Sequence, residues 1–249
     1  MVFALAEREN TEITVHYSLF TIHCSLFTYM TIYDQLTQFT LFQGMSRSDL
    51  MEVVAHTRLG FMKGSAGKRI VKEGDDSSTL ILMTHGELEC ETISDDHQCR
   101  VVERMAAPYM IQPERSFGMT QKYTSTFKAL SDCNFITIDK QEIMLLLETQ
   151  LVFRLNMLNM LAADAQRMRH RAWRSAPKTL RERIVRFFFS RCIYPAGAKT
   201  FYILMKQLAN ELNDSRLDIS NALNEMEEDG LLNLYRGRIE IPMLERLLM

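Results

Sequence analysis

The sequence predicts an α+β protein: an N-terminal antiparallel β jelly roll, a long helix, and a C-terminal winged helix-turn-helix. Three observations carry this prediction. Residues 58–138 are short apolar runs separated by Gly, Asp and Ser clusters, residues 140–172 are helical in pattern without Pro or Gly, and residues 205–241 contain two short helices and a hairpin. Evenly spaced short strands are typical of a small antiparallel barrel, whereas an uninterrupted apolar period near 3.6 indicates a helix.

The composition is that of a folded, soluble protein, and two domains are our starting interpretation. The chain has 249 residues, of which 47% are hydrophobic and 24% charged, which suits one large domain or two modest ones. We assign residues 30–138 to the jelly roll with two leading helices, 139–174 to the long helix, and 175–249 to the winged helix-turn-helix. Residues 1–29 show no recognisable pattern of helix caps or turns, so we expect a non-native or poorly ordered extension there, with Met30 as a candidate start.

The long helix carries a heptad seam. Positions alternate in steps of four and three, all apolar except one arginine: Leu147, Leu151, Arg154, Leu158, Leu161, Ala165 and Met168. A seam of this kind is typical of helices from two chains that pack side by side. The pattern favours a homodimer through residues 140–172 over a helix that packs only on its own barrel.

The C-terminal region predicts a helix-turn-helix. The first helix spans 205–212, Asn213-Asp214 forms the turn, and Ser215 can cap a second helix. The apolar residues of the second helix point inward, namely Ile219, Leu223 and Met226. The same spacing places base-reading and phosphate-reading side chains outward near its N-terminal half: Arg216, Ser220, Asn221 and Asn224.

A basic hairpin follows the second helix. In LLNLYRGRIEI, two alternating strands flank the turn Arg236-Gly237, as in the wing of a winged helix-turn-helix. We therefore predict that the second helix and its cap enter a DNA groove, through Ser215, Arg216, Ser220, Asn221 and Asn224. We predict phosphate contacts from Lys206, Arg236 and Arg238.

The charge distribution agrees with a nucleic-acid partner. Residues 1–164 hold 14 Lys+Arg and 21 Asp+Glu, whereas residues 165–249 hold 15 and 10. Residues 165–206 alone contain eleven Lys+Arg and one acid, Glu182. Such a cluster indicates an approach to phosphates, and a solvated helix face is the alternative.

The sequence predicts no catalytic residue, no metal and no cofactor. The five cysteines follow no CxxC pattern, which favours free, mostly buried thiols in a reducing cytoplasm: Cys24, Cys90, Cys99, Cys133 and Cys192. His56, His85 and His97 are dispersed and fit no paired-ligand spacing. The most apolar stretch, residues 13–32, is interrupted by His16, His23 and hydroxyl residues, so no membrane span is expected.

At this point the layout resembles the Crp/Fnr family of bacterial transcription regulators. The resemblance covers residues 33 to 243 and rests on LFQGMSRSDLMEVV, KGSAGKRIVKEGD, LMTHGELE and ELNDSRLDISNALNEMEEDGLL, in that order. It implies a cyclic-nucleotide-binding-like jelly roll, a dimer helix and a DNA-binding domain. The chain departs from the family in its second helix, where Arg-Glu and a later Arg are common but Leu217 follows Arg216 and Asn221 takes the later place.

The resemblance also implies a phosphate cassette, which is degenerate here. Family members that bind cyclic AMP carry Gly-Glu and, about ten residues later, Arg followed by Ser or Thr, which hold the ribose and the phosphate. The aligned pairs in this chain are Gln112-Pro113 and Tyr123-Thr124. A one-residue shift brings Glu114 into the acidic position, and Arg115 or Lys122 could supply a displaced cation. The candidate effector pocket is therefore Glu114, Arg115, Tyr123 and Thr124, and cyclic AMP is not the expected effector.

Together these features predict a homodimeric, sequence-specific DNA-binding transcription regulator with an unknown small-molecule effector. Two alternatives stay open. A genuine cyclic-nucleotide-responsive regulator would show a thermal shift with the nucleotide, and an effector-free interaction scaffold would show no salt-dependent DNA binding.

Overall fold

The structure, a computed structural model, describes residues 31–171 and 173–248, so the extension expected at 1–29 lies outside the described residues. Short helices precede the antiparallel sheets of the predicted jelly roll, which is called the barrel below: α2 (Ile32–Leu36), η1 (Thr40–Phe42) and α3 (Arg47–His56). Ser46 begins α3 with a capping box, in which its hydroxyl accepts from the Asp49 amide at 3.1 Å and Asp49 accepts from the Ser46 amide at 3.1 Å. Both orphaned amides are thereby paired.

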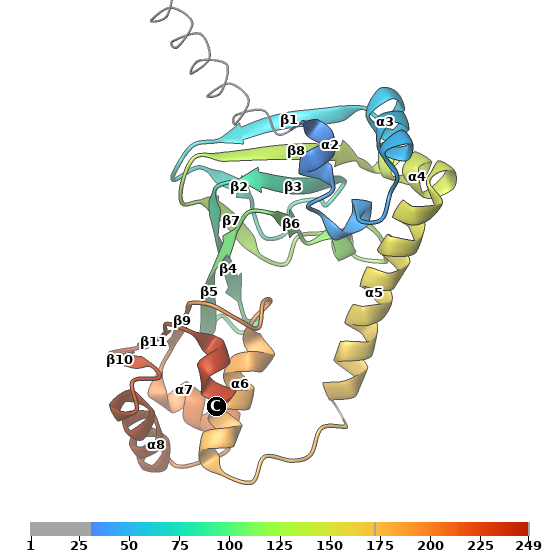
Figure 1. Cartoon of the computed structure of the whole chain (residues 1–249). Helices are drawn as coiled ribbons and strands as arrows, with labels where there is room; N and C mark the ends of the chain where they lie inside the picture. The colour runs from blue at the N-terminus through green and yellow to red at the C-terminus, as the bar shows by residue number, and fades with distance from the viewer. Residues whose placement is uncertain (1–30, 172, 249) are drawn as a thin grey trace, which may run out of the picture.

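The barrel is antiparallel throughout. Its strands are β1 (Leu59–Gly64), β2 (Arg69–Val71), β3 (Thr79–His85), β4 (Glu87–Ile93), β5 (Cys99–Ala106), β6 (Tyr109–Ile111), β7 (Thr126–Ala129) and β8 (Cys133–Asp139). One sheet has the order β1-β8-β3-β6, and β5-β4-β7-β2 form part of the other (Figure 1). Alternating side chains from both sheets fill the barrel, with Met83, Leu88 and Phe127 fully buried.

The helix expected over 139–174 is two helices. α4 (Lys140–Thr149) ends at Gln150, which has an extended backbone, and α5 (Leu151–Arg171) continues in a new direction. The single unbroken helix was therefore a wrong prediction at this residue. The break lets Ile143 and Leu146 of α4 pack with Phe153 and Met157 of α5 on one apolar cluster beside the barrel.

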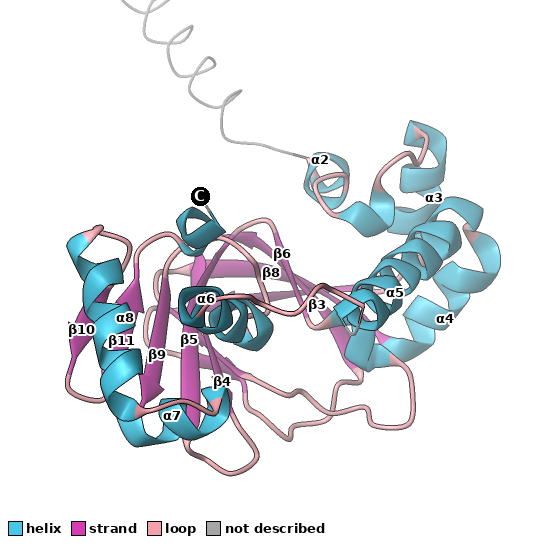
Figure 2. Ribbon diagram, turned by 90° about the horizontal axis from the view of Figure 1, so that it is seen from below, coloured by secondary structure: helices cyan, strands magenta, loops and turns pink. Residues whose placement is uncertain are grey.

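The C-terminal elements form a winged helix-turn-helix. They are α6 (Leu180–Arg191), β9 (Lys199–Ile203), α7 (Met205–Leu212), α8 (Arg216–Glu228), β10 (Asn233–Tyr235), β11 (Arg238–Ile241) and η3 (Leu244–Leu248). Ile219, Leu223 and Met226 are fully buried, as predicted from their spacing. Seen from below, α6, α7 and α8 cover one face of the β9–β11 strands (Figure 2).

The barrel and the C-terminal domain share one sheet, which the sequence did not indicate. β5 pairs with β9 in the register Cys99 to Ile203 through Glu103 to Lys199, so the full strand order is β10-β11-β9-β5-β4-β7-β2 (Figure 1). Val101 and Cys99 of β5 belong to the same buried cluster as Phe188 and Phe201. The two predicted domains are thus joined by backbone hydrogen bonds and by a common apolar core.

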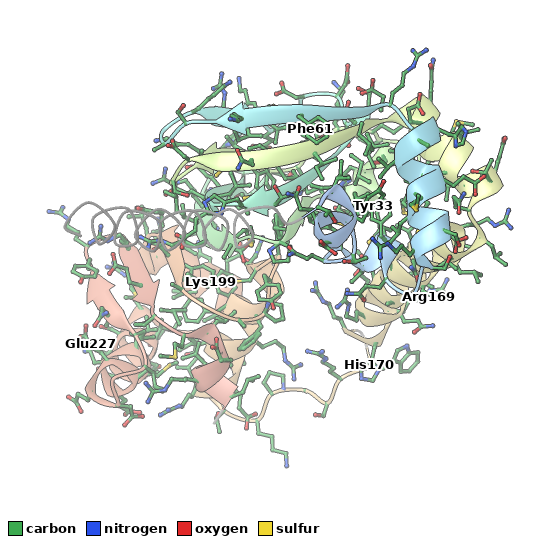
Figure 3. The ribbon with its side chains drawn as sticks, turned by 45° about the horizontal axis from the view of Figure 1, so that its top comes forward. Tyr33, Phe61, Arg169, His170, Lys199 and Glu227 are labelled. Atoms are coloured by element: carbon green, nitrogen blue, oxygen red, sulfur yellow. The ribbon has the colours of Figure 1, made fainter. Side chains whose placement is uncertain are left out.

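A fully buried ion pair lies at this junction. The Lys199 ammonium is 3.0 Å from Glu103 Oε1, and neither side chain is exposed. Lys199 is labelled in Figure 3. The Glu103 carboxylate also accepts from the amides of Ile193 and Tyr194, at 2.9 and 3.2 Å. A buried charge requires such partners, because its desolvation is otherwise uncompensated.

Candidate nucleic-acid interface

The turn between α7 and α8 is fixed by polar contacts. Asn213 adopts the left-handed conformation at φ 50°, which ends α7. Asp214 accepts from the Ser215 amide at 2.8 Å and from Arg183 at 2.5 Å, while Arg183 also donates to the Leu212 carbonyl. The Ser215 amide, followed by the Arg183 guanidinium, holds the pKa of Asp214 below its ordinary value. The angle between the two helices is therefore set from within the domain.

Ser215, a predicted groove residue, acts as the N-cap of α8. Its hydroxyl accepts from the Asp218 amide at 3.1 Å and donates to the Asp218 carboxylate at 2.6 Å. Both hydrogen-bonding roles of the hydroxyl are filled, so its contribution in this structure is to begin the helix.

Most arginines of α6 are engaged within the domain. Arg181 pairs with Asp229 at 2.7 Å, and Arg191 pairs with Glu211 at 2.8 Å. Arg186 donates to the Ser175 carbonyl at 2.6 Å. Together with Arg183, these side chains hold α6 against its neighbours, so much of the basic cluster in 165–206 has a structural role.

Three of the predicted phosphate- and base-reading cations converge on one concavity. Lys206 from the start of α7, Arg216 from the start of α8 and Arg236 from the wing turn line a hollow of about 360 Å³. The remaining lining residues are uncharged: Ile203, Leu204, Met205, Leu208, Leu234, Tyr235, Gly237 and Ile239. All three cations are exposed. The hollow therefore presents positive charge without an acidic side chain in its lining.

Arg238 lies beside this concavity but is partly engaged. Its Nε is 3.3 Å from Glu240 Oε1, and its guanidinium stacks 4.3 Å from the centre of the Tyr235 ring. Gly237 completes the wing turn at φ 73°, a conformation that favours glycine. In the wing, Arg236 is therefore exposed, whereas Arg238 is paired with Glu240.

The outward stripe of α8 is Leu217, Asn221 and Asn224, spaced by four and three residues. All three side chains are exposed, whereas Ser220 is half-buried. Leu217 was not among the predicted groove residues, because only polar side chains were considered. Counting four residues back from Asn221 on the sequence would have found it.

The C-terminal end of α8 is acidic, and two of its four carboxylates, those of Glu227 and Asp229, have partners within the domain. Glu227, labelled in Figure 3, accepts from the Leu234 amide at 2.7 Å, and Asp229 pairs with Arg181. Asp218 completes the cap of α8. The N-terminal half of the helix is therefore the part suited to a polyanion.

At the position of the family's phosphate cassette, the Gln112 side chain occupies the polar groups of Thr124. Gln112 has a left-handed backbone at φ 39° and precedes η2 (Pro113–Ser116). Its side-chain Oε1 accepts from the Thr124 amide at 2.9 Å, and its Nε2 donates to the Thr124 hydroxyl at 2.7 Å. These are the amide and hydroxyl that an anion at Thr124 would contact.

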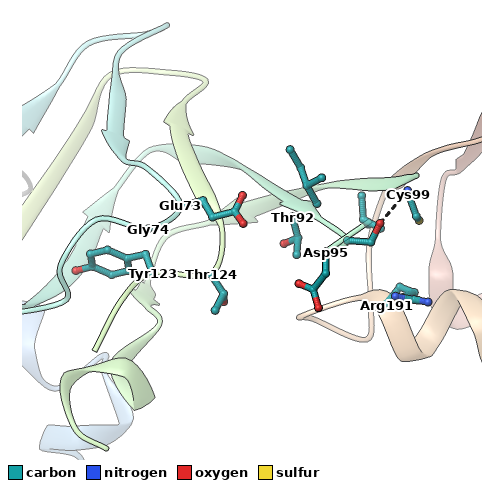
Figure 4. A pocket seen from close by; sticks show the side chains of 11 residues that line it. Glu73, Gly74, Thr92, Asp95, Cys99, Tyr123, Thr124 and Arg191 are labelled. Atoms are coloured by element: carbon teal, nitrogen blue, oxygen red, sulfur yellow. Dashed lines mark hydrogen bonds between the residues drawn. The ribbon is translucent and has the colours of Figure 1, made fainter. Parts of the chain in front are cut away.

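The predicted effector residues are divided between two places. Tyr123 and Thr124 line a cavity of about 410 Å³ with Glu73, Thr92 and, from α6, Arg191 (Figure 4). Tyr123 is otherwise buried, and its hydroxyl donates to the Thr79 carbonyl at 3.0 Å. Burial raises the pKa of the Tyr123 hydroxyl, which keeps the group neutral.

Glu114 and Arg115 do not line this cavity. They face each other, with Arg115 Nε 3.7 Å from Glu114 Oε1, and burial raises the pKa of Glu114. An arginine beside a carboxylate is a poor phosphate ligand because its charge is already partly neutralised. The four predicted effector residues therefore do not form a single pocket.

The cysteines do not form disulfides in the described residues. Within residues 31–171 and 173–248 the cysteines are free and buried, as expected: Cys90, Cys99, Cys133 and Cys192; Cys24 lies outside that range. Burial raises the pKa of the Cys90 and Cys192 thiols to about 12.

His56, His85 and His97 are exposed. In the described part of the chain, no cluster of three His, Cys, Asp or Glu side chains is placed to bind a metal, and no helix combines the length and apolarity of a bilayer span.

Comparison with known proteins gives structural matches only. No protein-family model and no curated protein sequence matches the chain. Among solved structures, the chain is similar to the catabolite activator protein of Thermus thermophilus (17% identity, 84% of this chain and 97% of that chain, TM-score 0.47). It is similar to a protein from Eubacterium rectale described as a transcriptional regulator of the Crp/Fnr family (20%, 84% and 96%, TM-score 0.42).

A third similar structure is the sensor domain of the transcriptional regulator DNR of Pseudomonas aeruginosa (16%, 59% and 94%, TM-score 0.46). Crp/Fnr-type regulators are thus among the solved structures that this chain resembles.

Proposed function

We propose that this chain is a homodimeric, sequence-specific DNA-binding transcription regulator of the Crp/Fnr type. The observation that carries the proposal is the concavity where Lys206, Arg216 and Arg236 converge from two helix starts and a wing, with no acid in its lining. A surface of this shape and charge fits the backbone of duplex DNA.

The start of α7 adds a second source of positive potential. Its N-cap is Leu204, whose side chain makes no capping hydrogen bond, so the first amides of the helix have no side-chain acceptor. Helix N-termini bind phosphate through such amides. A phosphate seated there would lie between Lys206 and Arg236, and it would set the depth at which α8 enters the major groove.

We assign the recognition of bases to the N-terminal half of α8. The exposed amides of Asn221 and Asn224 can pair with the adenine edge in the major groove, and Arg216 can donate to guanine. The cap at Ser215 and the ion pair at Asp214 hold these side chains in register. The C-terminal half of the helix, which is acidic, would then point away from the DNA.

Dimerisation is proposed through α5. Leu151, Leu155 and Leu158 are 57%, 48% and 56% exposed, and they form an apolar stripe in steps of four and three that Ala162 and Ala165 continue. Leu161 of the predicted seam instead packs against the cluster beside the barrel. Two such stripes would pair as a coiled coil and place two α8 helices about 34 Å apart, in successive major grooves.

The first test separates phosphate contacts from base contacts. Lys206→Ala and Arg236→Ala should weaken selected and scrambled duplexes alike. Each should lower the salt slope by about 1 per subunit, or about 2 for the dimer, because each removes one phosphate contact per subunit. Arg216→Ala should weaken the selected duplex alone, by about 1–3 kcal/mol. Fluorescence anisotropy between about 50 and 200 mM salt measures both quantities.

Lys128→Ala serves as the control, since Lys128 is exposed on β7 of the barrel and should leave both quantities unchanged. If the unaltered protein bound no duplex in a salt-dependent manner, the proposed function would be wrong.

The barrel is proposed to respond to something other than a cyclic nucleotide. The amide and hydroxyl of Thr124 are occupied by Gln112, and Arg115 is beside Glu114, so a cyclic phosphate would be desolvated without a partner. Calorimetry is expected to show no saturation by cyclic AMP or cyclic GMP below about 1 mM. Saturable micromolar binding that Thr124→Val abolished would contradict this.

A further inference from the structure

Leu217 is a large apolar side chain that the fold does not use. It is 70% exposed in the first turn of α8, and it is not among the residues packed against the C-terminal core. The helix start is already stabilised by Ser215 and Asp218. Single exposed leucines are common on protein surfaces, so exposure by itself implies nothing.

The position of Leu217 on α8 indicates a role in binding, which its exposure alone does not. Leu217 directly follows Arg216, which lines the basic concavity, and it lies four residues before Asn221 on the outward stripe of α8. The N-terminal residues of a recognition helix are the ones that contact base edges. The stripe therefore presents one methyl-rich group followed by two amides to whatever α8 approaches.

The major groove has one apolar group that matches this arrangement. The C5 methyl of thymine is the only hydrocarbon on a base edge there, and it accompanies the adenine that an Asn side chain recognises. An Asn and a Leu one helical turn apart can then read adenine and thymine in neighbouring base pairs. A cytosine at the same place has a hydrogen at C5 instead of the methyl group, so the leucine would lose its apolar partner.

We propose that Leu217 is a specificity-determining residue that contacts a thymine methyl group in each half-site. This inference rests on the proposed DNA binding of the chain. It requires that each half-site contain a thymine near the adenine read by Asn221, at a position where α8 enters the groove by its N-terminal half.

The test removes the methyl group and leaves the hydrogen bonds intact. The full-length protein is used to select duplexes from a random-sequence library, and each thymine of the best duplex is then replaced by deoxyuridine. One thymine per half-site should show a loss of about fourfold, as expected for burial of one methyl group at ~0.8 kcal/mol. Replacement in both half-sites should lower affinity by roughly tenfold or more.

The variants assign the effect to Leu217. Leu217→Ala should bind the thymine and deoxyuridine duplexes equally, whereas Leu217→Met should keep a preference for thymine. Asn221→Ala should lose affinity but keep the sensitivity to deoxyuridine. Circular dichroism and unchanged affinity for scrambled DNA verify that each variant is folded.

The outcomes separate the two levels of the proposal. Specific, salt-dependent binding with no deoxyuridine-sensitive thymine would overturn the role of Leu217 and leave the DNA-binding function intact. Persistence of that sensitivity in Leu217→Ala would also overturn it, because another group would then read the methyl. Absence of any DNA binding would overturn both.

Discussion

Lys199→Met is expected to lower the free energy of unfolding by about 3–5 kcal/mol, because it leaves the Glu103 carboxylate buried without its counter-ion. Neither side chain is exposed, and the two backbone amides that Glu103 accepts from do not neutralise its charge. The loss should be concentrated where β5 meets β9. Urea unfolding measures the total, and hydrogen exchange of the β5 and β9 amides measures its location.

Two further variants make this result specific. Glu103→Gln combined with Lys199→Met should be less destabilising than Lys199→Met alone, since the glutamine oxygen can still accept an amide and no buried charge is left. Lys128→Met, at an exposed position of β7 in the same sheet, should stay within about 0.5 kcal/mol of the unaltered protein. A change of less than about 0.5 kcal/mol for Lys199→Met would show that the ion pair does not hold the two domains together.

Leu155→Glu combined with Leu158→Glu is expected to convert the proposed dimer to a monomer. Both leucines lie on the exposed stripe of α5, about half of each surface is available for burial, and the substitution places like charges opposite each other across the two-fold axis. Loss of four half-buried leucines per dimer amounts to roughly 3–6 kcal/mol, or about a 10²- to 10⁴-fold weaker dimer. Analytical ultracentrifugation at micromolar concentration reports the change.

The matched control is Ala163→Glu, exposed on α5 about a third of a turn from the stripe. It adds the same charge and should leave the dimer intact. DNA affinity should fall with dimerisation in the double variant, because a monomer engages one half-site only. A protein that stayed dimeric after both substitutions would place the interface elsewhere, and a monomeric unaltered protein would contradict the proposed assembly.

Helix caps, buried helix faces and tight turns could be predicted from the sequence, because they depend on residues close together in the chain. The capping serines at 46 and 215, the buried face of α8 and the wing turn at Gly237 all follow from residue type and spacing within a few positions. Helix caps and amphipathic periodicity depend on neighbours in sequence, so one chain carries enough information for them. The jelly roll and the winged helix-turn-helix were accordingly predicted in the right order along the chain.

The sequence did not indicate interactions between side chains that lie far apart along the chain. Gln112 fills the place of an anion at Thr124, twelve residues away, and α6 uses its arginines on Asp214 and Asp229 instead of on solvent. The break at Gln150 is likewise set by packing on the cluster beside the barrel and has no Pro or Gly to mark it. Charge counts along a sequence cannot show which cations are already paired.

The sequence by itself determined most elements of this protein and their order, except for the break at Gln150 and strand β9. It also determined the basic and apolar residues of α7, α8 and the wing, because periodicity, caps and turns are set within a few residues. Only the tertiary structure decided how those elements are used. It brought Lys206, Arg216 and Arg236 to one hollow, left Leu217 outward, and joined β5 to β9 around Glu103 and Lys199. The physical reason is that burial and pairing are properties of side chains far apart in the sequence, and they are defined only once the chain has folded.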